Sequence, residues 1–307
     1  MSEAVVFEDF SAELDGREVL SRVSFSVANG EVTAIFGRSG SGKSLVMRAL
    51  CGLLPGSSGN VRVLGRPVVT LQQGLTRSAI VGFQSPSYAP ELTVQENLEL
   101  QASLWRVPRR KRAGRIAFLV QLLGLESLQR TRAARLSDGW KATMEIARAL
   151  LPETSVVAVD SLMDCLDPDV RNRLFRHIFD AARKENRSFL IASACSDIAE
   201  ICDRVVLMDK GSILATGTPE ELRAGAPDEV SVVQTVDNPA LRRRISERFN
   251  VVVQEEGGSL RFSAPQGDIL AADILSECDS QVTCVRVRRQ TLHEITDALA
   301  AGKRGAQ

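Results

Sequence analysis

The sequence predicts an α/β fold, a parallel sheet covered by helices on both faces, followed by a smaller α+β domain. Three observations support this prediction. Short apolar strands alternate with helical segments over most of the first 225 residues, which is the pattern of a parallel sheet. A glycine-rich turn joins one of these strands to a helix. The composition then changes at residues 223–229, Arg-Ala-Gly-Ala-Pro-Asp-Glu, which is typical of a linker.

The glycine-rich turn matches the phosphate-binding pattern G-x-x-x-x-G-K-[ST] without a departure. Its residues are Gly37, Arg38, Ser39, Gly40, Ser41, Gly42, Lys43 and Ser44. The glycines allow backbone N–H groups to curl around a phosphate at the start of the following helix. Lys43 is expected to reach the β- and γ-phosphates, and the Ser44 hydroxyl to ligate Mg²⁺. The motif therefore predicts ATP or a related triphosphate as ligand, and a P-loop NTPase core.

The segments before and after this loop predict the rest of the first domain. Residues 4–7 and 23–27 are short β-type runs around the turn Leu14-Asp15-Gly16-Arg17, and residues 60–64 and 67–70 are another strand pair. Together they predict an antiparallel β-subdomain. An apolar strand over 80–84 ends on Gln84, and the pattern then turns helical from residue 91 to about 128.

A second strand carries a carboxylate. Residues 156–160 read Val-Val-Ala-Val-Asp, so Asp160 ends an apolar strand and is predicted to share Mg²⁺ with Ser44. Further segments alternate in the same way. They are a helix over 170–183, a strand over 188–192, a helix around 197–202 and a strand over 205–208.

Beyond the linker the pattern predicts a small domain over residues 229–302. Its segments are a strand (230–236), a helix (239–249), two strands (251–254 and 260–263), a helix (268–277), a strand (282–288) and a last helix (291–300). The order βαββαβ followed by a helix is that of a ferredoxin-like domain. The sequence of this domain contains no motif that points to chemistry.

Composition and charge bear on which kinds of partner the chain can have. Lys and Arg together number 38, as do Asp and Glu, so the net charge gives no indication of a nucleic-acid partner. The chain has no leader-like N-terminus and no stretch of 18 apolar residues, so we expect a cytoplasmic protein that reaches a membrane only through partners. A basic cluster over 106–112, with Arg115, fits either contact with nucleic acid or anionic lipid, or a solvated helix start after Pro108.

The order of the motifs is more specific than any one of them. After the phosphate loop come Gln84 ahead of a helical insertion over about 86–150, Leu136-Ser-Asp-Gly-Trp140 opening a helix, Asp160, and Leu166-Asp167-Pro168. Residues 203–219 then end the domain. This order resembles the ATP-binding subunits of ABC transporters over residues 3–225, so residues 1–225 are expected to be an ABC-type ATP-binding domain. The separate tail domain resembles that of export-type subunits.

The resemblance implies a head-to-tail dimer in which each ATP lies between the phosphate loop of one subunit and the signature motif of the other. In that arrangement Ser137 and Gly139 face the partner's γ-phosphate, and Gln84 joins Ser44 and Asp160 at the Mg²⁺ ion. Membrane-spanning subunits would dock near residues 84–92, the segment that holds Tyr88. Import or export does not follow from the motifs.

The sequence departs from this family at the positions that carry hydrolysis. Relatives have a glutamate directly after the strand carboxylate, and this chain has Ser161, whose hydroxyl is not a useful base at pH 7. The loss of a positioned general base typically costs about 10²- to 10⁴-fold in rate. The family's switch histidine falls on Ala194, or on Ser193 if the spacing back from Asp203 is used, and neither is a histidine.

Two further departures concern binding. Asp138 and Trp140 stand where relatives have glycine and glutamine. Asp138 either faces the partner's γ-phosphate, with a repulsion on the order of 3 kcal/mol per unit charge at about 5 Å, or serves as a helix N-terminal acid. Leu14 aligns with the aromatic residue that stacks on adenine in relatives, so we expect weaker or less selective nucleotide binding.

These features lead to three hypotheses. In the first, the chain is a catalytically degenerate ATP-binding subunit that binds Mg-ATP and pairs with a second, hydrolysing nucleotide-binding subunit to drive transport. In the second, a homodimer hydrolyses ATP slowly, with Asp164 as the substitute base. In the third, the chain is a soluble regulatory or scaffolding protein that uses ATP to dimerise and docks no membrane subunit.

Overall fold

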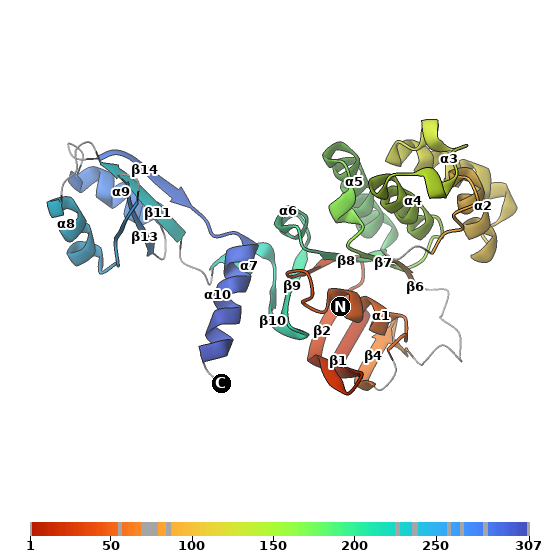
Figure 1. The fold of residues 1–307 in the computed structure, drawn as a ribbon, viewed down its shortest axis with the longest axis horizontal. Helices are drawn as coiled ribbons and strands as arrows, with labels where there is room; N and C mark the ends of the chain where they lie inside the picture. The colour runs from red at the N-terminus through yellow and green to blue at the C-terminus, as the bar shows by residue number, and fades with distance from the viewer. Residues whose placement is uncertain are drawn as a thin grey trace. The chain divides into compact units, whose positions relative to one another are not determined.

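The computed structural model describes residues 2–54, 57–68, 79–83, 87–224, 228–234, 239–256, 259–264, 267–278 and 282–305. The chain forms two compact units, Met1–Pro219 (unit 1) and Glu220–Gln307 (unit 2). Figure 1 shows them in red to teal and in teal to blue.

Unit 1 is built on a six-stranded sheet with the order β10-β9-β3-β8-β7-β6. Its strands are β3 (Val32–Phe36), β6 (Ala79–Gly82), β7 (Val156–Asp160), β8 (Ser188–Ser193), β9 (Arg204–Asp209) and β10 (Ser212–Gly217). All neighbouring pairs are parallel except β9 with β10. Every residue of β3, β7 and β8 is buried, as expected for strands covered on both faces. The predicted α/β fold is confirmed.

Helices cover this sheet (Figure 1). Helix α1 (Lys43–Leu50) packs on β7 and β8, α5 (Pro168–Glu185) on β3 and β8, and α6 (Ser196–Glu200) on β3, β8 and β9. Asp167 caps the N-terminus of α5 through the Asp169 N–H, and Pro168 takes the first helical position, where no backbone donor is needed. Helix α5 ends at Asn186, in the left-handed conformation (φ 54°).

The predicted antiparallel subdomain is a four-stranded sheet with the order β2-β1-β4-β5. Its strands are β1 (Glu3–Leu14), β2 (Arg17–Ala28), β4 (Ser57–Val63) and β5 (Arg66–Pro67). The β1–β2 turn uses Asp15 and Gly16 at φ of 51° and 71°, the conformation that two-residue hairpins prefer. Phe7 and Phe25 stack with ring centroids 4.8 Å apart, in a core that also contains Met47 of α1.

The helical insertion contains α2 (Val94–Leu104), α3 (Arg109–Leu123) and α4 (Asp138–Leu150), together with two short 3₁₀ turns, Glu126–Leu128 and Ala133–Arg135. Thr93 and Glu96 cap α2 reciprocally. The helical region predicted from 91 to about 128 is interrupted between α2 and α3, because Arg106 takes a positive φ of 53° and Pro108 caps the start of the next helix. No helix in the described part of the chain has the length and apolarity that a membrane span needs.

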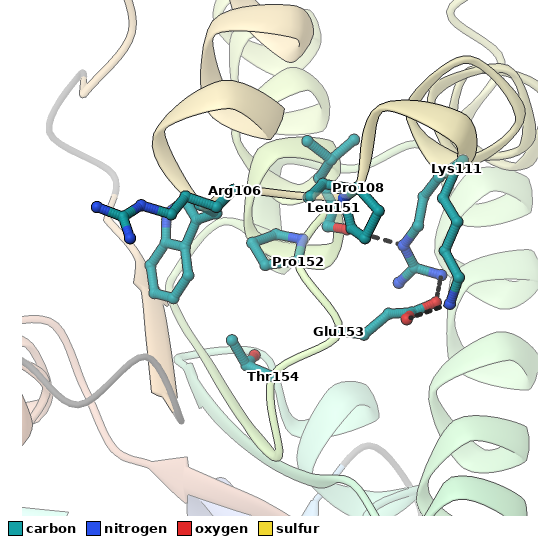
Figure 2. Close-up of a pocket in the computed structure, with 10 residues that line it drawn as sticks. Arg106, Pro108, Lys111, Leu151, Pro152, Glu153 and Thr154 are labelled. Atoms are coloured by element: carbon teal, nitrogen blue, oxygen red, sulfur yellow. Dashed lines mark hydrogen bonds and ion pairs between the residues drawn. The ribbon is translucent and has the colours of Figure 1, made fainter.

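Half of the basic cluster, namely Lys111, Arg112 and Arg115, is tied into this insertion (Figure 2). The Arg112 Nε donates to the Val107 carbonyl at 2.7 Å, and Arg115 donates to the carbonyls of Leu150 and Leu151 at 2.8 Å, at the C-terminus of α4. Lys111 lies 3.4 Å from the Glu153 carboxylate. The contacts of Lys111 and Arg115 hold α3 against the end of α4, while Arg106, Arg109 and Arg110 are exposed, as expected for a solvated helix start.

Unit 2 contains β11 (Asp228–Gln234), α8 (Pro239–Phe249), β12 (Gln254–Glu256), β13 (Ser259–Ala264), α9 (Gly267–Cys278), β14 (Val282–Arg288) and α10 (Leu292–Gly305). Helix α7 (Pro219–Ala224) precedes them. The strand order is β12-β13-β11-β14 with all pairs antiparallel, which is the split βαβ arrangement predicted from the sequence. The strand predicted over 251–254 is displaced. Asn250 turns the chain at φ 50°, Val253 enters the core, and pairing with β13 begins only at Gln254.

Candidate nucleotide-binding site

The loop of residues 37–44 runs from the end of β3 into α1, and its backbone needs glycine at two places. A Cβ at Gly37 would lie 2.3 Å from the Met208 carbonyl oxygen and 2.6 Å from the Ser41 Oγ, so no side chain fits there. Gly42 takes φ 104° and is the N-cap of α1. Since this N-cap has no side chain, the positive end of the helix stays open to a phosphate group.

The Lys43 ammonium occupies the centre of the loop. Its Nζ donates to the carbonyls of Gly37 at 2.6 Å and Arg38 at 2.8 Å, and the residue is only 6% exposed. Burial lowers the pKa of Lys43, while the nearby carboxylates of Asp164 and Asp160 act in the opposite direction. A desolvated cation surrounded by loop carbonyls fits a site that receives a multiply charged phosphate chain.

The hydroxyl and carboxylate predicted to hold Mg²⁺ lie together. The Ser44 Oγ donates to the Asp160 Oδ1 at 3.0 Å, at the carboxyl end of β7. Asp160 is 4% exposed, and burial raises its pKa, partly offset by the hydrogen bonds from Ser44 and Ser161. A hydroxyl and one carboxylate are hard oxygen ligands that suit Mg²⁺ when phosphate oxygens and water complete the octahedron. The third predicted ligand, Gln84, lies outside the described residues.

The described residues hold no cluster of three or more His, Cys, Asp or Glu side chains that could hold a metal ion.

The segments after β7 and β8 are joined to each other. Ser161, directly after Asp160, takes a positive φ of 56°, and its N–H donates to the Ala192 carbonyl at 2.9 Å. Asp164 accepts from the Ser193 Oγ at 2.5 Å and from the Ala194 N–H at 3.0 Å, one bond to each carboxylate oxygen. Asp164 therefore forms hydrogen bonds to Ser193 and Ala194, the two residues that align with the histidine expected from the resemblance.

The signature segment opens α4. Ser137 is the N-cap, but its side chain makes no capping hydrogen bond, so its hydroxyl is not used by its own helix. Asp138 is 96% exposed at its side chain, lies in the first turn of α4 and contacts the Lys141 Nζ at 3.0 Å. A Cβ at Gly139 would lie 3.2 Å from the Cys165 carbonyl oxygen, so Gly139 lets α4 approach the segment after β7 closely.

Leu14, the predicted adenine position, is half-buried at the end of the β1–β2 hairpin. Strand β2 of this hairpin is anchored beside the phosphate loop. The Ser21 N–H donates to the Gly211 carbonyl, and the Gly211 N–H donates to the Ser41 carbonyl, both at 2.9 Å.

A buried polar network in unit 1 was missed by the sequence analysis. The Arg148 Nη1 donates to both oxygens of Glu145, at 2.8 and 2.9 Å, and its Nη2 donates to the carbonyl of Ser87 and to the Gln101 Oε1. Glu145 in turn accepts from the Ser87 N–H at 3.0 Å. Both charged side chains are almost fully buried. The available signal was a Glu and an Arg three residues apart in the mostly apolar segment 142–150 of α4.

Together, the parallel sheet, the phosphate loop at the end of β3 and the Ser44–Asp160 pair at the end of β7 define a nucleoside-triphosphate-binding protein of the P-loop class. The family model described as ABC transporter matches residues 20–163. The Nod factor export ATP-binding protein I of Rhizobium etli is 30% identical over 220 residues, which cover 71% of this chain and 69% of that protein.

The methionine import ATP-binding protein MetN 1 of Paraburkholderia xenovorans is 30% identical over 287 residues, covering 89% of this chain and 81% of that protein. A solved structure described as an ATP binding subunit of an ABC transporter superposes with a TM-score of 0.66 at 25% identity, over 72% of this chain and 92% of that chain. The chain spans only 58% and 64% of two further methionine import relatives. The chain belongs to the ABC transporter family, as an ATP-binding subunit.

Proposed function

We propose that this chain binds Mg-ATP without hydrolysing it efficiently, and that it pairs with a second, hydrolysing nucleotide-binding subunit to drive transport across a membrane. The phosphate loop, Lys43, Ser44 and Asp160 would hold the nucleotide and its metal. One observation carries the proposal. The Ser44–Asp160 pair is formed at 3.0 Å, while the next position is Ser161, and the end of β8 offers Ser193 and Ala194 in place of a histidine.

The surroundings of Asp164 support the non-hydrolysing assignment. A general base must accept a proton from water through a lone pair that points at it. Each carboxylate oxygen of Asp164 accepts one hydrogen bond, from the Ser193 hydroxyl and the Ala194 N–H, so only its remaining lone pairs could face a water. Slow hydrolysis by a homodimer, with Asp164 as base, is the second candidate. The observation that favours it is that the Asp164 carboxylate lies near enough to Lys43 of the phosphate loop to raise the pKa of that ammonium group.

In the proposed pair, Ser137 and Gly139 complete the nucleotide site of the partner subunit. Ser137 suits this role because its hydroxyl does not cap its own helix. Membrane subunits would dock near residues 84–92, and the chain would lie at the cytoplasmic face of the membrane through them. Near the same insertion, Leu100 and Leu104 of α2 are 39% and 64% exposed, which fits an apolar contact there. The proposal includes no direction of transport, because the relatives include an export and several import proteins.

The pairing is tested by purifying the membrane complex through a tag on this chain and counting its nucleotide-binding subunits by native mass spectrometry. We expect one copy of this chain and one copy of a different nucleotide-binding subunit, whose sequence carries the glutamate and the histidine. Two copies of this chain in the complex would contradict the pairing. Equal ATP turnover by the wild type and Asp164→Ala would contradict the second candidate.

A further inference from the structure

Residues 104–110 form an exposed segment that combines apolar and basic side chains. The segment runs from the last residue of α2 into the first turn of α3. Five of its seven residues are exposed, namely Leu104, Arg106, Pro108, Arg109 and Arg110, and Trp105 and Val107 are half-buried. Leu104 alone is 64% exposed. The link is compact, because the Val107 N–H donates to the Ala102 carbonyl at 2.8 Å, so the leucine and the arginines lie close together.

The three arginines of this segment have no acidic partner. Among the described residues, none forms a hydrogen bond or an ion pair with the side chains of Arg106, Arg109 or Arg110. The Glu153 carboxylate, in the pocket beside the segment, pairs with Lys111 at 3.4 Å, and Figure 2 shows Arg106 directed away from it. Since Lys and Arg equal Asp and Glu in number over the whole chain, this segment is a local concentration of positive charge in a neutral protein.

The basic residues do not stabilise the helix that they open. The first turn of α3 begins with Arg109 and Arg110 and contains no acidic residue, and Pro108 at the N-cap position provides no side-chain hydrogen bond. Positive side chains at the N-terminus of a helix oppose its dipole. A local choice that works against the structure around it is expected where the residues serve a function.

We propose that residues 104–110 are a contact surface for the headgroups of an anionic lipid bilayer. The negative potential of such a bilayer attracts arginine side chains close to its surface. Leucine and tryptophan beside basic residues are typical of segments that lie in the membrane interface, where the apolar groups enter the boundary between headgroups and acyl chains. The bilayer would cover Leu104 and neutralise the arginines, whereas a nucleic acid would give Leu104 no apolar contact.

The test measures binding of the full chain to lipid vesicles by flotation. It uses neither nucleotide nor partner subunits, so it can fail independently of the function proposed above. The vesicles contain phosphatidylcholine alone or phosphatidylcholine with an equal amount of phosphatidylglycerol. We expect binding to the phosphatidylglycerol vesicles only, and a loss of at least about tenfold when salt is raised from about 50 to about 300 mM, because salt screens exposed charges. Equal binding to the two kinds of vesicle would overturn the proposal.

Matched variants locate the contact. Arg109→Gln with Arg110→Gln is expected to raise the lipid concentration for half-maximal binding at least about tenfold. Arg242→Gln with Arg244→Gln, the same change of charge on exposed residues of α8, should leave it unchanged. Leu104→Ser is expected to weaken binding at least about threefold without altering its salt dependence.

Three results would contradict this location of the contact. The first is unchanged binding in the Arg109 and Arg110 double variant or in Leu104→Ser. The second is a loss in the α8 double variant equal to that in the Arg109 and Arg110 double variant. The third is binding of a short DNA duplex as tight as that of the vesicles and unaffected by Leu104→Ser, because it would identify a nucleic-acid surface instead.

Discussion

Replacement of Arg148 by Met is expected to destabilise unit 1 by about 3–5 kcal/mol. The guanidinium lies in a buried network, with side-chain exposures of 7% for Arg148 and 4% for Glu145. Met fills similar volume but leaves the Glu145 carboxylate charged and without its cation in a site closed to water, and the cost of such a truncated buried pair is about 3–5 kcal/mol. The Ser87 carbonyl and the Gln101 amide oxygen also lose their donor.

The assay is urea unfolding followed by tryptophan fluorescence, because both tryptophans, Trp105 and Trp140, lie in unit 1. The double variant Glu145→Leu with Arg148→Met removes both charges, so its loss of stability is expected to fall at least about 2 kcal/mol short of the sum of the two single losses. Lys184→Met breaks an exposed pair with Asp180 and is expected to cost less than about 0.5 kcal/mol.

The reasoning would be refuted if the double variant lost as much stability as the two single variants together. A stability loss below about 1 kcal/mol in Arg148→Met would refute it as well. Either result would mean that the pair is solvated in solution. The network also ties Ser87, three residues after Gln84, to the helix that the signature segment opens. If the network is formed as described, Arg148→Met also loosens the predicted docking segment.

Three further predictions concern the site and the pH dependence of stability. Gly37→Ala is expected to weaken ATP binding at least tenfold in equilibrium dialysis, because its Cβ would lie 2.3 Å from a backbone oxygen, whereas Gly114→Ala, with open space around it, should bind as the wild type does. Asp164→Asn removes a negative charge that acts on Lys43, so ATP should bind about two- to fivefold more tightly at low salt, and the gain should shrink as salt is added. An unchanged affinity would contradict this. Burial raises the pKa of the Cys51 thiol to about 12. The unfolded chain then loses this proton at lower pH than the folded chain does, so stability is full below about pH 9 and falls between about pH 9 and 12. In urea unfolding at pH 8 and 10, Cys51→Ala should lose less stability than the wild type between the two values, and equal losses would show that this thiol does not contribute.

Much of the fold could be predicted because local patterns determined it. Strand β7 was predicted to the residue, since an uninterrupted apolar run ends at Asp160. Helix α8 and strand β14 were also predicted at their observed bounds. Strand β12 was placed three residues too early, because Val251–Val253 have strong β propensity but the turn at Asn250 delays their pairing.

The parts of the site that the sequence did not reveal depend on contacts between distant segments. A Glu and an Arg three residues apart on a helix are usually an exposed pair, and Glu145 and Arg148 are buried because α2 places Gln101 over them. Likewise, Asp164 was recognised only as a nearby carboxylate. Its direction depends on Ser193, 29 residues further along the chain, which binds it from the end of β8.

The most direct test of the proposed function is ATP binding and ATP turnover measured on the same preparation of this chain, each beside a Lys43→Ala control. We expect ATP to bind with an affinity that falls at least tenfold in Lys43→Ala, and turnover no higher than that of the control. Turnover well above the control, and lost together with Lys43, would contradict the account. It would show that another group in this chain acts as the general base in place of the missing glutamate.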